Sequence, residues 1–137
     1  MNEVPVLYIL MRDDLDSMNP GKAMAQASHA SNAFVHSKRL MHEGSPENEK
    51  LYRSWSAETT QGFGTVLVLG VNKIEMEQAV AVAKMANYDA EIIHDPTYPL
   101  QDGDYCHFIP LDTCAYIFGN KDDPVLTAIV QNFELHE

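Results

Sequence analysis

The sequence has few cysteines, the residues that cross-link small secreted proteins by disulfide bonds. It also has no apolar run long enough to cross a membrane as a helix. Cys106 and Cys114 are its two cysteines, too few for a disulfide scaffold and suited to a reducing cytosol. Apolar runs such as Thr65–Val71 are far shorter than the ~20 residues that a membrane-spanning helix needs. The segment Met1–Pro5 carries no basic side chain, whereas a secretory signal begins with a cationic region. We therefore expect a soluble, cytoplasmic protein.

Basic residues are also scarce. The chain has nine Lys and Arg against 20 Asp and Glu, a formal net charge of −11, which argues against a protein that coats nucleic acid. Residues 1–53 hold six basic and seven acidic side chains, whereas residues 54–137 hold three and thirteen. A surface that binds a polyanion should therefore lie in residues 1–53; the alternative is an acidic surface that only keeps the protein soluble. The cations of residues 1–53 are Arg12, Lys22, Lys38, Arg39, Lys50 and Arg53.

The chain does contain a regular succession of apolar strands and capped helices. Its 137 residues, 45% of them hydrophobic, fit one domain over residues 1–137. The patterns predict strands at 4–11, 65–71 and 91–94, a loop at 95–99, extended pieces at 105–109 and 113–118, and helices from Pro20 to about His42, from Pro46, from Asn72 to about Tyr88 and from Pro124 to about Phe133.

This order of elements predicts an α/β fold: a single-domain mixed β-sheet of about four strands with helices packed on both faces. At least one antiparallel pair should lie near the C-terminal end, because the connections there are too short for crossover helices.

The helix predicted from Pro20 has a polar face beside an apolar one. Lys22, Gln26 and His29 share one stripe at helical spacing, next to a stripe of alanines that can pack closely on a sheet. Lys22 stands in the first turn, where the helix dipole is already positive, so its charge fits a functional role better than a stabilising one. Gly21 would let the backbone approach a ligand. The alternative is an ordinary solvated helix face.

The first strand of the chain ends in Arg12-Asp13-Asp14-Leu15. It is followed by Met18 and then by the segment Gly21-Lys22-Ala23-Met24-Ala25-Gln26-Ala27-Ser28-His29-Ala30. This stretch resembles the start of the type 2 peptidyl-tRNA hydrolases, in which Arg-x-Asp-Leu precedes a Met and a Gly-Lys-x-Ala-Ala-Gln-x-Ser-His-Ala helix. The resemblance implies a hydrolase without metal or cofactor that cleaves the ester bond of peptidyl-tRNA. It also favours a homodimer.

The resemblance further implies catalytic positions. Lys22 falls on the family's functional lysine, and Asp95 falls on its functional aspartate, which begins an Asp-Ala-Gly-x-Thr stretch after the third strand. In this chain Pro96-Thr97-Tyr98-Pro99 follows Asp95, so Thr97 is the nearby hydroxyl of that type and stands two positions early. The predicted catalytic residues are therefore Lys22, Asp95 and Thr97.

These residue types suit ester hydrolysis. Asp95 can orient the attacking water, and Lys22 can stabilise the developing oxyanion or tune the carboxylate. Phosphate contacts from Arg12, Lys38 and Arg39 would make the affinity for tRNA fall as salt rises. The residues predicted to bind substrate or tRNA are Arg12, Gly21, Gln26, Ser28, His29, Lys38 and Arg39.

Other patterns in the sequence give weaker signals. His94-Asp95 and the scattered histidines have no recognised metal-ligand spacing such as HExxH. Cys106 and His107 are neighbours in an expected strand and so point to opposite faces, which argues against a nucleophile–base pair. Gly62-Phe63-Gly64 lacks the spacing of a phosphate-binding loop. Trp55 is predicted to belong to the core.

Two alternative functions stay open. The departure from the family pattern after Asp95 and the net charge of −10 over residues 54–137 would also fit a related domain that has lost hydrolysis and serves as a binding or regulatory module. The other alternative is a hydrolase that uses the same pocket for a different, less anionic ester or amide. The hydrolytic interpretation requires that the Lys22 ammonium and the Asp95 carboxylate share a cleft.

Overall fold

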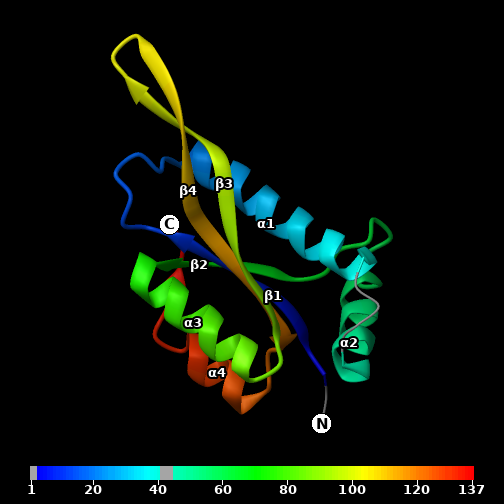
Figure 1. The fold of residues 1–137 in the computed structure, drawn as a ribbon. Coiled ribbons are helices and arrows are strands. Elements are labelled where there is room, and N and C mark those ends of the chain that lie inside the picture. The colour runs from blue at the N-terminus through cyan, green and yellow to red at the C-terminus, as the bar shows by residue number, and fades with distance from the viewer. Residues whose placement is uncertain (1–2, 41–44) are drawn as a thin grey trace.

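A computed structural model describes residues 3–40 and 45–137 (Figure 1). The predicted end of the first long helix, near His42, lies outside the described residues. The elements are β1 (Pro5–Arg12), α1 (Pro20–Leu40), α2 (Pro46–Ser56), β2 (Val66–Val71), α3 (Lys73–Met85), β3 (Asp89–Asp102), β4 (Tyr105–Asn120), α4 (Pro124–Val130) and β5 (Glu134–Leu135). None of the described helices is both long and apolar enough to span a lipid bilayer.

The strands form one mixed sheet in the order β3-β4-β1-β2-β5. β1 lies in the middle, parallel to β2 and antiparallel to β4, and all eight of its residues are buried. A strand covered on both faces needs apolar side chains at nearly every position, which explains the unbroken apolar run at the start of the sequence. The α/β class and the antiparallel pairing near the C-terminus are confirmed. The sheet also contains a short strand that the sequence did not predict, β5, which is antiparallel to β2.

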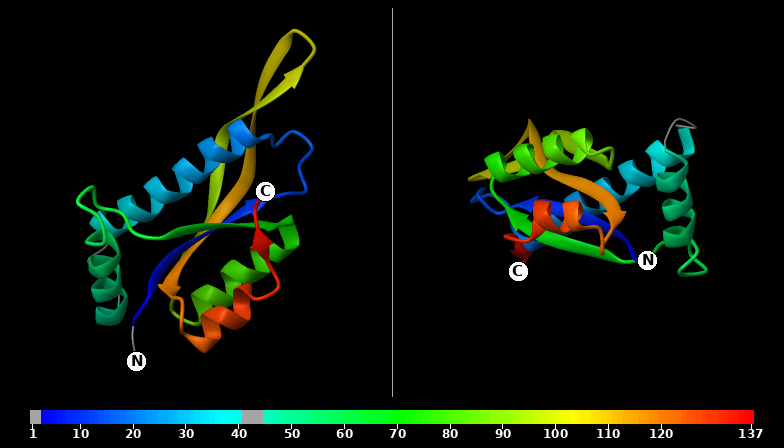
Figure 2. Two further views of the ribbon diagram at one scale, coloured as in Figure 1. Left: turned by 180° about the vertical axis from the view of Figure 1, so that it is seen from behind. Right: turned by 90° about the horizontal axis from the view of Figure 1, so that it is seen from below.

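Helices cover both faces of the sheet, as predicted (Figure 2). α3 and α4 pack on one face, and α1 and α2 pack on the other. The second face is centred on Phe34, whose ring centroid lies 4.7 Å from that of Phe118 and 5.4 Å from that of Trp55. Trp55 is fully buried and donates its indole N–H to the Thr65 carbonyl oxygen (2.9 Å), so its prediction as a core residue is confirmed.

Capping residues fix the helix starts where the sequence predicted them. The Asn19 side chain accepts a hydrogen bond from the Lys22 backbone N–H (2.9 Å) at the start of α1. Asn72 forms a complete capping box at the start of α3. α3 ends before the predicted Tyr88, because Asn87 adopts a left-handed backbone conformation (φ 66°) that does not continue a right-handed helix.

The prediction of a loop at residues 95–99 is wrong, because β3 runs through this segment to Asp102. Its prolines indicated a loop, since proline cannot donate a backbone hydrogen bond to a sheet. β3 is an edge strand, however, and an edge leaves one side of the strand without a partner, where proline is tolerated. The register with β4 also shifts between Asp95 and Tyr98, so Pro96 falls within an irregularity of the strand.

The extended pieces predicted at 105–109 and 113–118 are parts of one strand, β4. β3 and β4 together form a long hairpin, and its outer part projects from the body of the protein (Figures 1 and 2). We call residues 99–111 the arm. Residues 101–108 of the arm are all exposed.

Candidate active site

The Asp95 carboxylate lies at the register shift of β3 and is only 8% exposed. One of its oxygens accepts a hydrogen bond from Gln26 Nε2 of α1 (2.7 Å). The other accepts hydrogen bonds from the backbone N–H of Thr97 (2.9 Å) and from its hydroxyl (3.3 Å). A buried carboxylate with donors on both oxygens is held in one orientation.

Gln26 links this carboxylate to a third element of the fold. Its side chain is buried, and its oxygen accepts a hydrogen bond from the Thr113 hydroxyl of β4 (2.6 Å). Because a donor occupies the amide oxygen, the amide NH₂ must face Asp95. Gln26 was predicted to bind substrate; in the structure it is 2% exposed and contacts the carboxylate instead.

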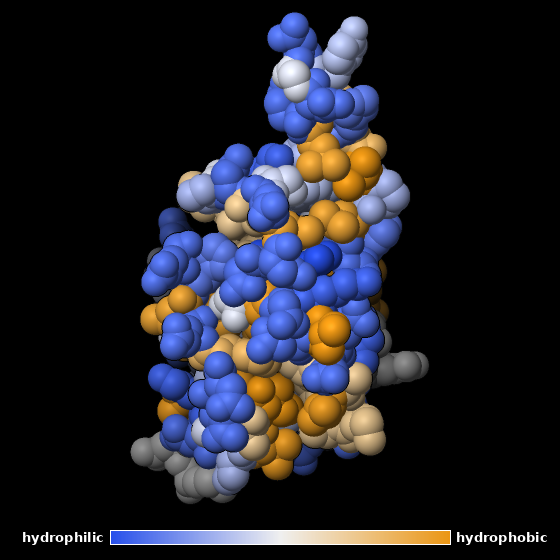
Figure 3. All heavy atoms as spheres, turned by 90° about the vertical axis from the view of Figure 1, so that its left-hand side faces the viewer, coloured by the Kyte–Doolittle hydropathy of each residue, from blue (hydrophilic) through white to orange (hydrophobic). Residues whose placement is uncertain are grey.

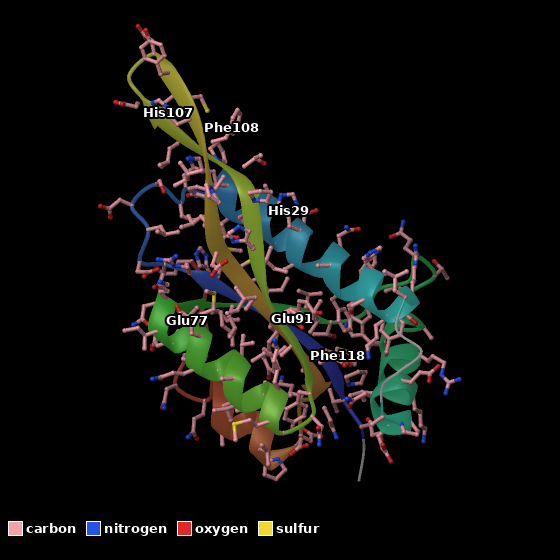
Figure 4. The ribbon with its side chains drawn as sticks, viewed as in Figure 1. His29, Glu77, Glu91, His107, Phe108 and Phe118 are labelled. Carbon is pink, nitrogen blue, oxygen red and sulfur yellow. The ribbon has the colours of Figure 1, made fainter. Side chains whose placement is uncertain are left out.

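The surroundings of Asp95 keep its carboxyl group ionised. Burial is the largest single influence and by itself would raise the pKa, because it removes water from the charged form. Hydrogen bonds from Gln26 and Thr97 and the electrostatic effect of His29 together outweigh burial and lower the pKa below the ordinary 3.8. Figure 4 shows His29 on α1, close to β3. A carboxylate of low pKa is a weak base, better suited to orient a water than to take its proton.

Lys22 reaches the same segment of β3 from the first turn of α1. Its Nζ donates a hydrogen bond to the Pro99 carbonyl oxygen (2.7 Å) and lies 5.1 Å from the ring centroid of Tyr98. Lys22 and Asp95 therefore both take part in contacts between α1 and β3, at positions four residues apart along the strand. That the two groups share a cleft stays a prediction. No other described residue accepts a hydrogen bond from this ammonium, which leaves two of its three N–H donors for a ligand.

A comparison with known protein families identifies the family of this chain. The family model described as Peptidyl-tRNA hydrolase PTH2 matches residues 5–118. The chain belongs to this family. The resemblance noted at the start of α1 is thereby confirmed, and the match extends through β3 and into β4.

The fold of this PTH2 family member is also found in a solved structure. A protein of unknown function from Agrobacterium tumefaciens strain C58 is similar with a TM-score of 0.56, 8% sequence identity and coverage of 100% of both chains. At this identity the likeness shows a shared fold alone. A search of curated proteins finds no significant match.

Tyr98 packs the loop that precedes α1 against β3 in this PTH2 domain. Its ring is fully buried under Lys22. Its hydroxyl lies 2.9 Å from Ser17 Oγ and 3.9 Å from Met18 Sδ, both in the loop before α1. Sequence reasoning missed Tyr98 and Thr113, because no local pattern places either of them beside α1.

The remaining predicted residues of α1 separate onto two sides of the helix. His29 lies on the edge that carries Lys22 and Gln26. Ser28 and Arg39 line a groove between α1 and α2 instead, and at about 100° per residue they are roughly half a turn around the helix from Gln26. The structure therefore does not bring Ser28 and Arg39 to Asp95.

Two of the predicted phosphate-binding cations are engaged within the fold. The Arg12 guanidinium is 7% exposed and donates to both carboxylate oxygens of Asp14 (2.9 and 3.1 Å) and to the Asp112 carbonyl oxygen (3.0 Å). Its hydrogen bonds are the main cause that lowers the pKa of Asp14. The Lys38 ammonium pairs with Asp89 at the start of β3. Both cations join separate elements of the sheet and helices, and their contact with phosphate stays a prediction.

Other groups near the site have limited chemistry of their own. A Cβ at Gly21 would make only an ordinary contact with Asn19 Oδ1 (3.5 Å), so nothing within the protein requires glycine there. Cys114 lies beside the Gln26 carbonyl oxygen, and burial raises the pKa of its thiol to about 12, which makes it unreactive at neutral pH. Over residues 3–40 and 45–137, no group of three or more His, Cys, Asp or Glu side chains is placed to hold a metal ion.

Proposed function

We propose that this PTH2 family member hydrolyses the ester bond of peptidyl-tRNA and releases peptide and tRNA. The observation that carries the proposal is the buried Asp95 carboxylate, held by Gln26 and Thr97, along the same β3 segment that holds the Lys22 ammonium. We also propose that the protein acts in the cytoplasm, where translation supplies this substrate.

In the proposed reaction Asp95 orients a water molecule towards the ester carbonyl carbon. As the new C–O bond forms, the water releases a proton to solvent, and the tetrahedral intermediate then breaks its bond to the ribose oxygen, which takes up a proton from solvent and leaves as the tRNA hydroxyl. Lys22 donates to the oxygen that becomes negative as the water attacks, and a fixed cation there stabilises the transition state more than the substrate. The Thr97 hydroxyl makes only a long hydrogen bond to Asp95 (3.3 Å), so it can turn to the substrate. The proposal uses protein side chains alone.

A second candidate function is a binding or regulatory module of the same fold. Asp95 already has donors on both oxygens, and Lys22 is bound to the Pro99 carbonyl oxygen. A polar cluster satisfied in this way can also serve only to join α1 to the hairpin. The departure from the family's Asp-Ala-Gly-x-Thr stretch favours the same interpretation.

The test is to incubate the purified protein with labelled N-acetyl-aminoacyl-tRNA, and separately with simple N-acyl amino-acid esters. We expect cleavage of the tRNA ester. Lys22→Ala should lower kcat/KM by about 100- to 1,000-fold, the usual effect of losing one oxyanion donor, and Asp95→Asn should impair the reaction by a similar factor. Lys73→Ala is the matched control, because Lys73 is an exposed lysine in the first turn of α3.

Each alternative has its own outcome in this assay. Cleavage of the simple esters alone would indicate a different substrate, and no cleavage of either would favour the binding module. Turnover by Lys22→Ala at the rate of the unaltered protein would contradict the catalytic role of the ammonium.

A further inference from the structure

The arm leaves the body of the protein beside Lys22. The Lys22 ammonium donates a hydrogen bond to the carbonyl oxygen of Pro99, the first residue of the arm. Tyr98, which directly precedes the arm, is fully buried under the same ammonium. These contacts hold the base of the arm against the first turn of α1, and the rest of the arm projects past the start of that helix (Figure 1). The arm therefore begins at the cation that donates to the oxyanion in the proposed reaction.

One face of the arm continues the surface over which this ammonium lies. Side chains alternate between the two faces of a strand, and directly paired residues of neighbouring strands share a face. Tyr98 pairs with Ile109, and the register then runs without a shift to the last pair of the hairpin, Asp102 and Tyr105. The 3.8 Å distance from Asp102 to His107 fits this alternation. We call the face that starts at Tyr98 the inner face of the arm, and its residues are Leu100, Asp102, Tyr105, His107 and Ile109.

The apolar side chains of the inner face become more exposed with distance from the body. Leu100 and Ile109, next to the buried Tyr98, are half-buried. Tyr105, near the tip, is 74% exposed. In Figure 3 apolar side chains gather where the arm leaves the body, and the tip is hydrophilic. An apolar surface that starts at a reaction site offers contact to an extended apolar chain joined to the reacting group.

The charge of the arm disfavours contact with the tRNA part of the substrate. The sequence has no Lys or Arg between Lys84 and Lys121, and the tip of the arm carries Asp102 and Asp104. An acidic surface without cations repels phosphate groups. The peptide is the part of peptidyl-tRNA that carries no phosphate. An acidic tip also favours a peptide with a cationic group some residues away from the ester.

We propose that the inner face of the arm binds the peptide part of the substrate, with apolar peptide side chains against Leu100, Ile109 and Tyr105. An extended chain advances about 3.3 Å per residue, so the third or fourth peptide residue from the ester lies near Asp102. The preferred peptide is therefore apolar next to the ester and carries a cation about four residues away. This inference rests on the proposed function, because the peptide is defined as a part of that substrate.

The test is an NMR titration of the nitrogen-15-labelled protein at 50 mM salt with stable analogues of the substrate. Each analogue is a tetrapeptide joined to 3′-amino-3′-deoxyadenosine through an amide in place of the ester, so the measurement needs no hydrolysis. We expect acetyl-Lys-Ala-Leu-Leu to shift the backbone signals of Leu100, Ile109 and Tyr105. It should bind about 10-fold more tightly than acetyl-Lys-Ala-Gly-Gly, the effect of partly burying two leucines. It should bind about 3-fold more tightly than acetyl-Glu-Ala-Leu-Leu, and 500 mM salt should abolish this second difference.

The opposite face of the arm provides a matched control for the apolar contact. Phe108 pairs with Pro99 and is 66% exposed, so it is an aromatic side chain of similar exposure on the other face of the ribbon. Figure 4 shows Phe108 on the projecting part of the hairpin. Tyr105→Ser should remove most of the affinity gained from the two leucines, whereas Phe108→Ser should keep it. Circular dichroism establishes that each variant is folded.

A second pair of variants tests the charge of the tip. Asp102→Lys/Asp104→Lys should reverse the preference between the lysine and glutamate analogues, because the tip then carries cations. Glu134→Lys/Glu137→Lys makes the same charge change at the exposed C-terminal end, next to β5 at the other edge of the sheet. This control should keep the preference for the lysine analogue.

The inference is overturned if the leucine analogue leaves the arm signals unshifted, if Phe108→Ser weakens binding as much as Tyr105→Ser, or if reversal of the tip charge leaves the preference unchanged. A loss of affinity for deacylated tRNA in Tyr105→Ser would assign the arm to nucleic acid and would overturn it as well. If the protein cleaves peptidyl-tRNA and gives any of these results, the inference fails and the proposed function stands. If the analogues bind as expected and peptidyl-tRNA is not cleaved, the proposed hydrolysis alone fails.

Discussion

The hydrogen-bonded series from Thr113 through Gln26 to Asp95 makes a quantitative prediction. Gln26→Leu keeps a side chain of similar size and removes both of its hydrogen bonds. A buried bond to a charged group contributes about 1.5–3 kcal/mol, and a neutral one about 0.5–1.5 kcal/mol. We therefore expect the free energy of unfolding to fall by about 2–4 kcal/mol, a large part of the roughly 5–15 kcal/mol typical of a domain.

The assay is equilibrium unfolding in urea at neutral pH, combined with a double-mutant cycle. Thr113→Val alone removes only the neutral bond and should cost about 1 kcal/mol. In the Gln26→Leu background the Thr113 hydroxyl has already lost its oxygen acceptor and keeps only a long contact with Cys114 Sγ (3.8 Å), so Thr113→Val should cost little or restore some stability. The two effects should therefore be non-additive by about 0.5–3 kcal/mol, as for residues in direct contact.

The same variant has a consequence for catalysis. Loss of the Gln26 donor removes a hydrogen bond that lowers the pKa of Asp95, so the acid limb of the kcat/KM profile should move to higher pH. Additive losses in the cycle, or an unfolding free energy that changes by less than about 0.5 kcal/mol, would refute the role assigned to Gln26. If the acid limb does not shift, the ionisation that sets the acid limb of the kcat/KM profile is not that of Asp95.

Three further predictions concern Tyr98, Asp95 and Gly64. Tyr98→Phe removes the contact with Ser17 and should cost about 1 kcal/mol in urea unfolding; no loss would contradict its anchoring role. Because folding lowers the pKa of Asp95, its carboxylate stabilises the protein above pH 3.8, and this contribution is lost as the pH falls through the lowered value. The difference in the free energy of unfolding between the unaltered protein and Asp95→Asn should therefore disappear as the pH falls. A difference that stays constant with pH would contradict the stabilising role of the Asp95 carboxylate. Gly64→Ala places a Cβ 2.5 Å from the Trp55 carbonyl oxygen and should cost about 1–3 kcal/mol, whereas Gly21→Ala, with room for its Cβ, should not.

Local signals in the sequence were enough to predict much of the fold. The continuous apolar run of β1 predicted a central strand, and Asn19 and Asn72 marked the starts of α1 and α3, as the structure has them. Helical spacing alone also put Lys22 and Gln26 on one side of α1. Each of these features depends on residues within a few positions of one another, which is the range over which strand patterns, caps and helix faces act.

The contribution of β3 to the site became clear only from the assembled sheet. The prolines at residues 95–99 indicated a loop, but the segment lies at the edge of the sheet, where the missing N–H costs nothing. The position of a strand within a sheet is a property of the whole topology, and no local pattern of residues carries it.

The same limit applies to the partners within the site. Thr113 and Gln26 are 87 positions apart in the chain, and Arg12 and Asp112 are 100 apart. Local sequence specifies which elements form and which chemical groups they carry. Which groups meet depends on the register of β3 against β4 and on the packing of α1 over the hairpin, because contacts between distant segments are set only when the sheet assembles.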